Sequence, residues 1–148
     1  MASLEEQLNT DMRTAMKARE KERLGTIRLL LSAVRYESLA KQRDLTPDEG
    51  LSILARAAKR RRASIEAFEK GNRPELAEKE AAELLIIGEY LPDQLSKDEV
   101  VEIVKQAIAD TGAGSMKDFG RVMGAVMPKL KGKFPGKDVK PILNSLLG

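Results

Sequence analysis

The amino-acid sequence predicts an all-α fold. Residues that favour helices, namely Ala, Leu, Glu, Lys and Arg, dominate its 148 positions, and the alternating runs of β-branched and aromatic residues that favour strands are missing. Apolar residues recur every three or four positions, as they do along one face of a helix. Cap and stop signals divide the chain into seven predicted helices, four before residue 94 and three after it.

The four helices of the first part are bounded by residues that start or stop helices. Ser or Thr followed three positions later by Glu is a capping box, which satisfies free backbone donors in the first turn. Glycine, or the residue before a proline, tends to end a helix. The boundary signals are Ser3–Glu6, Arg19–Lys21, Lys41–Asp44, Thr46–Glu49, Gly71, either Asn72 or Arg73, and Glu89–Pro92.

A change in charge at a proline break predicts two units, residues 1–93 and residues 94–148. The first unit carries 17 basic and 17 acidic side chains, whereas the second carries 9 basic and 6 acidic ones. A unit as small as the second buries a modest share of its surface when it folds alone. We therefore expect the first unit to support it.

Three helices are predicted in residues 94–148. A capping box at Ser96 and Glu99 opens the fifth helix, and Thr111–Gly114 ends it. The sixth begins at Ser115, and Pro128 is expected to kink or end it. The apolar stripe predicted for the sixth helix is Met116, Phe119, Met123, Val126, Met127 and Leu130. The residues that the seventh helix is expected to bury are Val139, Ile142, Leu143, Leu146 and Leu147.

The most basic stretch of the chain is residues 115–140. It holds seven Lys or Arg and two Asp, a net charge of +5, whereas the whole chain carries +3. Gly120 and Gly124 stand four apart in its helix and leave backbone bare, so the pattern is typical of a surface that docks a polyanion. Alternatively, these glycines let two helices approach and the lysines only aid solubility. The candidate binding residues are Lys117, Arg121, Gly124, Lys129, Lys131, Gly132, Lys133, Lys137 and Lys140.

A second basic run, residues 59–62, lies in the third predicted helix. Charge runs on helices are usually solvated faces, with Arg62 and Glu66 here spaced as an i,i+4 pair. The alternative is a second phosphate contact. Four consecutive residues point around more than one helical turn, so they cannot all meet one ligand. The candidates for this second patch are Lys59, Arg61 and Arg62.

Composition argues against several functions. Without His or Cys, the chain cannot build the usual triads or zinc sites, and we predict no metal and no cofactor. Serines near lysines, such as Ser64 and Ser115, lack a cradle, and Gly112–Gly114 is too short for a phosphate loop. The first residues are unlike a signal peptide, and no apolar run approaches about 20 residues. We expect a cytoplasmic protein without a membrane partner.

Two stretches resemble the GatB/YqeY family: EYLPDQLS (residues 89–96) and GSMKDFGRVMGAVMPKLKGKFPGKDVKPILNSLL (residues 114–147). The first unit resembles the stand-alone YqeY-like members. The second unit is similar to the tail of the B subunit of tRNA-dependent amidotransferases. Those enzymes use glutamine to convert misacylated aspartyl- or glutamyl-tRNA to the amide form. The resemblance implies that this tail helps to grip the tRNA elbow.

The resemblance also suggests roles for single residues. Gly124 matches a glycine before a Met-containing turn, Lys131–Lys133 match a Lys-Gly-Lys corner, and Lys137 matches the start of the last helix. Pro128 stands where the tail more often has a basic residue, and the ATP-dependent activating domain of the parent subunit is absent from these residues.

We therefore predict a non-catalytic module that binds tRNA or another structured RNA. One alternative is an accessory part of a carbon–nitrogen ligase with glutamine as amido-N-donor, with an amidotransferase or aminoacyl-tRNA synthetase as partner. The other is a protein–protein adaptor, which would use either the methionine face of the sixth helix or a seam of the second. That seam consists of Leu24, Ile27, Leu31 and Val34.

Overall fold

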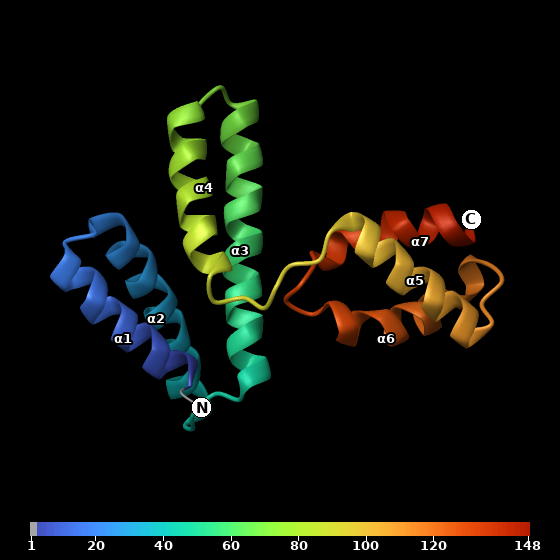
Figure 1. The fold of residues 1–148 in the computed structure, drawn as a ribbon, viewed down its shortest axis with the longest axis horizontal. Helices are drawn as coiled ribbons and strands as arrows, with labels where there is room; N and C mark the ends of the chain where they lie inside the picture. The colour runs from blue at the N-terminus through green and yellow to red at the C-terminus, as the bar shows by residue number, and fades with distance from the viewer. Residues whose placement is uncertain (1–2) are drawn as a thin grey trace. The chain divides into compact units, whose positions relative to one another are not determined.

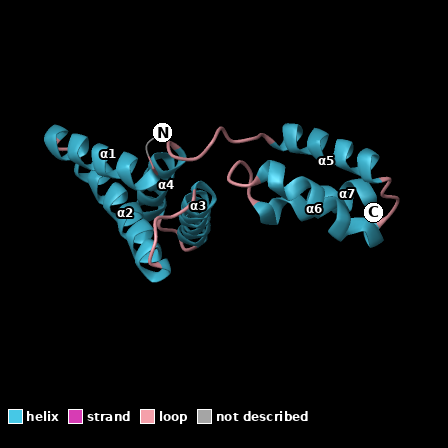
Figure 2. Cartoon of the chain, turned by 90° about the horizontal axis from the view of Figure 1, so that it is seen from below, coloured by secondary structure: helices cyan, strands magenta, loops and turns pink. Residues whose placement is uncertain are grey.

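A computed structural model describes residues 3–148 and confirms the all-helical prediction (Figures 1 and 2). These residues form seven α-helices and two short 3-10 turns, with no strand among them. The α-helices are α1 (Leu4–Ala18), α2 (Lys21–Lys41), α3 (Pro47–Lys70), α4 (Pro74–Gly88), α5 (Lys97–Thr111), α6 (Phe119–Leu130) and α7 (Val139–Leu147). The 3-10 turns are η1 (Met116–Asp118) and η2 (Gly136–Asp138). Contacts divide the chain into two compact units, one ending at Leu91 and the other spanning Pro92–Gly148.

The first unit consists of two helical hairpins, in which α1 packs along α2 and α3 along α4 (Figure 1). α2 also contacts both α3 and α4, which joins the hairpins. The start signals work as expected, because the Ser3 hydroxyl accepts the Glu6 N–H and the Thr46 capping box is complete. The buried residues of this core are Leu8, Ala15, Ile27, Leu30, Leu31, Val34, Ile53, Leu54, Ala58 and Ile87.

Two side chains after α4 hold the end of the first unit. The Tyr90 hydroxyl donates a 2.5 Å hydrogen bond to Asp11 of α1. Glu89 forms a 2.8 Å ion pair with Arg23 of α2. Burial raises the pKa of Tyr90, and the adjacent Asp11 carboxylate raises it further. The segment leaving α4 is thereby attached to the other hairpin.

Glu49 should make the stability of the first unit depend on acid pH. Its carboxylate accepts the Thr46 N–H and pairs with Arg43 at 2.7 Å and Lys41 at 2.9 Å. The hydrogen bond from Arg43, followed by that from Thr46, holds the pKa of Glu49 well below the ordinary value of 4.5. A depressed folded-state pKa stabilises the fold above pH 4.5 and loses that contribution as the pH falls further.

We therefore expect Glu49→Gln to lower the Tm at neutral pH by a few degrees and to flatten its decline between about pH 5 and pH 3. Thermal melts of both proteins across this pH range would check the prediction. Parallel pH curves for the two proteins would contradict it.

The second unit packs α5, α6 and α7 around its own core. The buried residues are Val100, Val104, Ala107, Val122, Val126, Leu130, Val139, Ile142 and Leu143. The centre of the α6 face is the seam Val122, Val126 and Leu130, and Val122 was missing from the predicted stripe. The larger Phe119 and Met123 flank this seam and are only half-buried, because the centre of a tightly packed three-helix core favours the smaller valine.

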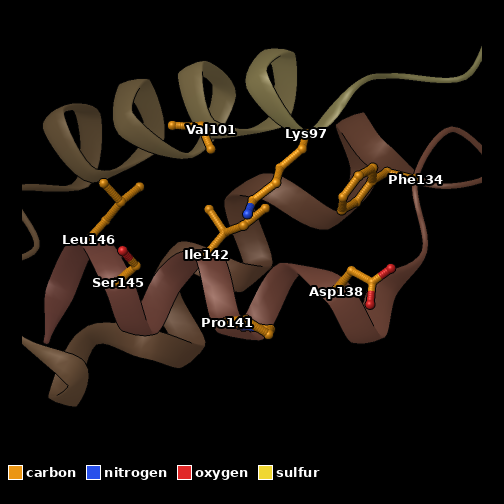
Figure 3. A pocket seen from close by; sticks show the side chains of 8 residues that line it. All are labelled: Lys97, Val101, Phe134, Asp138, Pro141, Ile142, Ser145 and Leu146. Carbon is orange, nitrogen blue, oxygen red and sulfur yellow. The ribbon is translucent and has the colours of Figure 1, made fainter.

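One apolar residue of α7 was predicted to be buried but does not reach the core. Leu146 keeps 36% of its surface exposed. With Val101 of α5 and Ile142 of α7, it lines an open groove of about 500 Å³ (Figure 3). Leu146 lies on the same side of α7 as Val139 and Leu143, but in the last turn of this nine-residue helix, where it borders the open groove. The prediction that Leu146 is buried was therefore wrong.

The prolines and turns set where α6 begins and ends. Ser115 caps η1 rather than an α-helix, because its hydroxyl accepts the Lys117 N–H at 3.3 Å. Pro128 lies inside α6, which continues only to Leu130. None of the described helices is long and apolar enough to cross a membrane.

Candidate nucleic-acid interface

The outer face of α6 forms an exposed strip opposite its buried seam. Apart from the neighbours Gly120 and Arg121, its members follow one another at intervals of three or four residues, so they line one side of the helix and its two ends. We call this surface the α6 strip. It consists of Lys117, Gly120, Arg121, Gly124, Pro128 and Lys131, all of which are exposed.

The two glycines of the α6 strip face open space. A Cβ atom added to Gly120 or Gly124 would meet no atom within 4 Å. The alternative that these glycines let two helices approach therefore does not hold for the described residues. A glycine inside a helix is less favourable than alanine by about 0.5–1 kcal/mol. No packing contact offsets that cost at Gly124.

Gly124 leaves the backbone accessible, as the sequence suggested, but the backbone group that it makes available is a carbonyl. Within a helix, backbone N–H groups donate to carbonyls one turn earlier, so the glycines present close access to the backbone rather than free donors. Pro128 has no N–H to donate to the Gly124 carbonyl, four residues earlier. The strip thus combines glycines without side chains, the Gly124 carbonyl, which lacks its i+4 hydrogen-bond donor, and cations at both ends.

The Lys-Gly-Lys corner follows α6 and is held by the segment before α5. Gly132 has a φ of 76°, a left-handed conformation that glycine adopts with little strain. Its carbonyl accepts a 2.7 Å hydrogen bond from the Gln94 side chain. The Lys133 carbonyl accepts the Leu95 N–H at 2.8 Å. The two stretches that carry the family resemblance therefore meet here, and Gln94 is a positioning residue that the sequence analysis missed.

The remaining candidate cations lie beside this corner or on other surfaces. Added to Gly136, a Cβ would lie 3.3 Å from the Met127 side chain, so the turn before α7 packs against the end of α6. Lys137 follows directly and is exposed. Lys140 is exposed on α7, whereas Lys129 falls on a different side of α6 from the strip. The strip and the corner contain six of the nine candidates, four of them cations, and Lys137 borders them.

Most of these cations lack an acidic partner. Arg121 pairs with Asp118 at 2.8 Å, and Asp118 also accepts the Gly114 N–H at 3.0 Å. Arg121 is therefore partly neutralised. Within residues 3–148, no carboxylate lies within ion-pair distance of the other candidate cations. These unpaired residues are Lys117, Lys129, Lys131, Lys133, Lys137 and Lys140.

The three residues of the second basic patch do not form one surface. The Arg61 side chain is only 16% exposed and pairs with Glu83 at 2.9 Å and with Glu80 at 3.6 Å. It therefore holds α3 against α4 instead of offering its charge to solvent. Lys59 is exposed, while Arg62 is half-buried and its Nε atom has no hydrogen-bond partner among the described residues. The patch remains a prediction for Lys59 and Arg62.

The described residues place no group of three acidic side chains where it could hold a metal ion. Ser115, one of the two serines considered as nucleophiles, uses its hydroxyl to cap η1. Neither observation provides a metal-ligand set or an available serine nucleophile among the described residues.

Comparison with known proteins corrects the predicted location. The chain is 33% identical over 129 residues to "Altered inheritance of mitochondria protein 41, mitochondrial" of Pyrenophora tritici-repentis, covering 85% of this chain and 70% of that protein. It is 35% identical to the protein of the same name in Kluyveromyces lactis, over 70% of this chain and 57% of that one. These names contradict the cytoplasmic prediction. That prediction was based on absent sequence signals, which do not distinguish one compartment inside a cell from another.

A third relative and a family match complete the comparison. An uncharacterized protein of Schizosaccharomyces pombe is 32% identical over 55% of this chain and 67% of its own length. The family described as Yqey-like protein matches residues 5–147, which include both helical units. The resemblance to the stand-alone YqeY-like proteins is thereby confirmed, and the chain belongs to the YqeY-like protein family.

Proposed function

We propose that the chain binds structured RNA, with tRNA as the first candidate, and makes or breaks no bonds itself. The surface is the α6 strip together with the Lys131–Lys133 corner. The observation that carries the proposal is the combination of two open glycines with unpaired lysines on and beside one helix. A polyanion can approach the backbone closely there and meet positive charge at both ends of the strip.

Electrostatics and composition favour a folded RNA over a single strand. Lysines bind phosphates without reading sequence, and A-form RNA is recognised largely by its shape. Single-strand readers usually stack bases on aromatic side chains, but only 3% of this chain is aromatic. The carbonyl of Gly124 adds an acceptor that a ribose 2′-hydroxyl could use, which a phosphate could not.

The proposal extends to the unit Pro92–Gly148 as the RNA-binding module. Its three helices carry the stretch that is similar to the tail of the amidotransferase B subunit. The hydrogen bonds from Gln94 and Leu95 to the corner lie within this unit, so it contains both the strip and the residues that position the corner.

Titration of the full chain with total tRNA over a salt series tests the proposal. Each neutralised phosphate releases counterions, so contacts with five phosphates should give a slope of about −4.5 for log affinity against log salt concentration. Absence of binding at low salt, or binding that ignores salt, would rule out the proposed function.

Two substitutions at Gly124 distinguish a role of this residue in RNA binding from a role in stability. Gly124→Ala should raise the free energy of unfolding by about 0.5–1 kcal/mol, because the added methyl meets no neighbour and alanine favours the helix. Gly124→Leu should keep the fold but weaken tRNA binding about tenfold, because its larger side chain blocks close approach. Chemical denaturation and tRNA titration of both variants provide the measurements. If Gly124→Leu binds as tightly as the wild type, the strip is not the contact surface.

A further inference from the structure

α2 carries a second apolar face that the other helices of the first unit leave exposed. Its first face, which includes Ile27, Leu31 and Val34, is buried in the core of the first unit. The adaptor surface suggested from the sequence is therefore largely unavailable to a partner. On another side, Leu29 is 55% exposed and Tyr36 is 78% exposed. A helix with apolar residues on two faces has one face more than its own fold uses.

The exposed face has the spacing of a helix-packing seam. Leu29, Ala33, Tyr36 and Ala40 follow one another at intervals of four, three and four residues. This is the a/d pattern by which two helices pack side by side. The seam extends over about three turns, or roughly 16 Å.

The seam forms one wall of a groove, and α3 forms the other. The groove has a volume of about 470 Å³ and lies within the first unit. Ile53 and Ala57 of α3 contribute apolar surface, and Arg56 and Arg60 contribute charge. The groove is thus an apolar channel between two helices, with arginines along its α3 side.

The groove is lined by more basic than acidic side chains. Its one carboxylate, Glu37, already pairs with Arg56 at 3.4 Å. Arg61 is occupied by the acidic residues of α4. Arg60 is exposed and has no carboxylate within ion-pair distance among the described residues. An occupant with acidic residues beside its apolar stripe would complement this wall.

We propose that the α2–α3 groove binds an amphipathic helix of a partner protein, with apolar residues at a/d spacing and acidic residues on the flank facing α3. Recognition of a helix in a groove commonly uses this combination. Two copies of this chain packed through the same face would bring their arginines together, which disfavours self-association. The aliphatic side chains that line much of the groove offer no hydrogen-bond partners to the phosphates of a nucleic acid. The proposal does not depend on RNA binding by the second unit.

A phage-displayed library of 18-residue helical peptides tests this inference on the full chain. Its a and d positions vary among Leu, Ile, Phe and Ala, and its flanking positions vary among Glu, Lys and Gln. We expect selection to enrich Glu on one flank. The enriched peptides should bind the double variant Leu29→Ser/Tyr36→Ser, and separately Arg60→Glu, at least about tenfold more weakly than the wild type.

Matched variants control for surface polarity and charge. Leu85→Ser changes a leucine that is 76% exposed on α4, outside the groove, and Lys79→Glu reverses an exposed charge on α4. Both should leave peptide binding unchanged, and circular dichroism should show that every variant keeps its helices. No enrichment, enrichment of Lys, or equal binding to the groove variants would overturn the proposal.

Two other measurements identify different occupants, and either positive result would overturn the proposal. Sedimentation that shows a dimer, dissolved by Leu29→Ser/Tyr36→Ser, would assign the groove to a second copy of the chain. A loss of tRNA affinity in the same double variant would assign it to RNA.

Discussion

Replacing both Lys131 and Lys133 by glutamate should weaken tRNA binding about 100-fold at low salt. A hydrogen bond between a charged group and its partner contributes about 1.5 kcal/mol or more, close to a factor of ten in affinity. Two such contacts account for the expected loss. The fold should persist, because the bonds that hold the corner involve backbone carbonyls, including that of Lys133, and not lysine side chains.

The same double variant should change the salt dependence as well as the affinity. Losing two phosphate contacts should reduce the steepness of the salt slope by nearly two. Lys17→Glu/Lys79→Glu makes the same change in net charge at exposed positions of the first unit and provides the control. If this control loses as much affinity, the effect is one of overall charge, and the corner is not a specific contact.

Leu130→Ala should unfold the second unit while the first remains folded. Leu130 is fully buried at the end of α6 and packs in the core of the second unit. Removing a buried leucine side chain costs about 2–5 kcal/mol. A unit as small as Pro92–Gly148 has a total stability of only about 3–8 kcal/mol by the usual scaling with length. The substitution therefore removes a large part of that stability, and all of it at the lower end of the range.

Hydrogen exchange resolved along the chain would measure this effect. Protection should be lost in α5–α7 and retained in α1–α4, and tRNA binding should be lost in parallel. The exposed Leu85→Ala on α4 should change neither. Simultaneous loss of protection in all seven helices would show that the two cores do not unfold separately.

The helix boundaries could be predicted because their causes are local. The capping boxes at Thr46 and Ser96 form as expected, because each needs residues only three positions apart. The end of α3 shows the limit of this reasoning. Gly71 follows the helix, but its φ is −84°, and the left-handed residue is Asn72 with a φ of 57°. A glycine signals a stop more readily than it specifies which residue makes the turn.

The residues of the candidate site could be named from the sequence, but their geometry could not. Charge and glycine spacing identified the segment, whereas the accessibility of Gly124 and the neutralisation of Arg61 depend on neighbours far along the chain. The hydrogen bond between Gln94 and Gly132 joins residues 38 positions apart. Nothing in local sequence specifies such a contact. Val122 was missed for a related reason, because the size of a core position is set by the helices around it.

Photocrosslinking of the full chain to 4-thiouridine-labelled tRNA, with mass spectrometry of the modified peptides, tests the central claim most directly. It reports both whether RNA binds and which residues it touches. The proposed interface predicts crosslinks within residues 115–140 that disappear when Lys131 and Lys133 are both replaced by glutamate. Crosslinks confined to α1–α4, or none at low salt, would contradict an RNA interface on α6 and the corner that follows it.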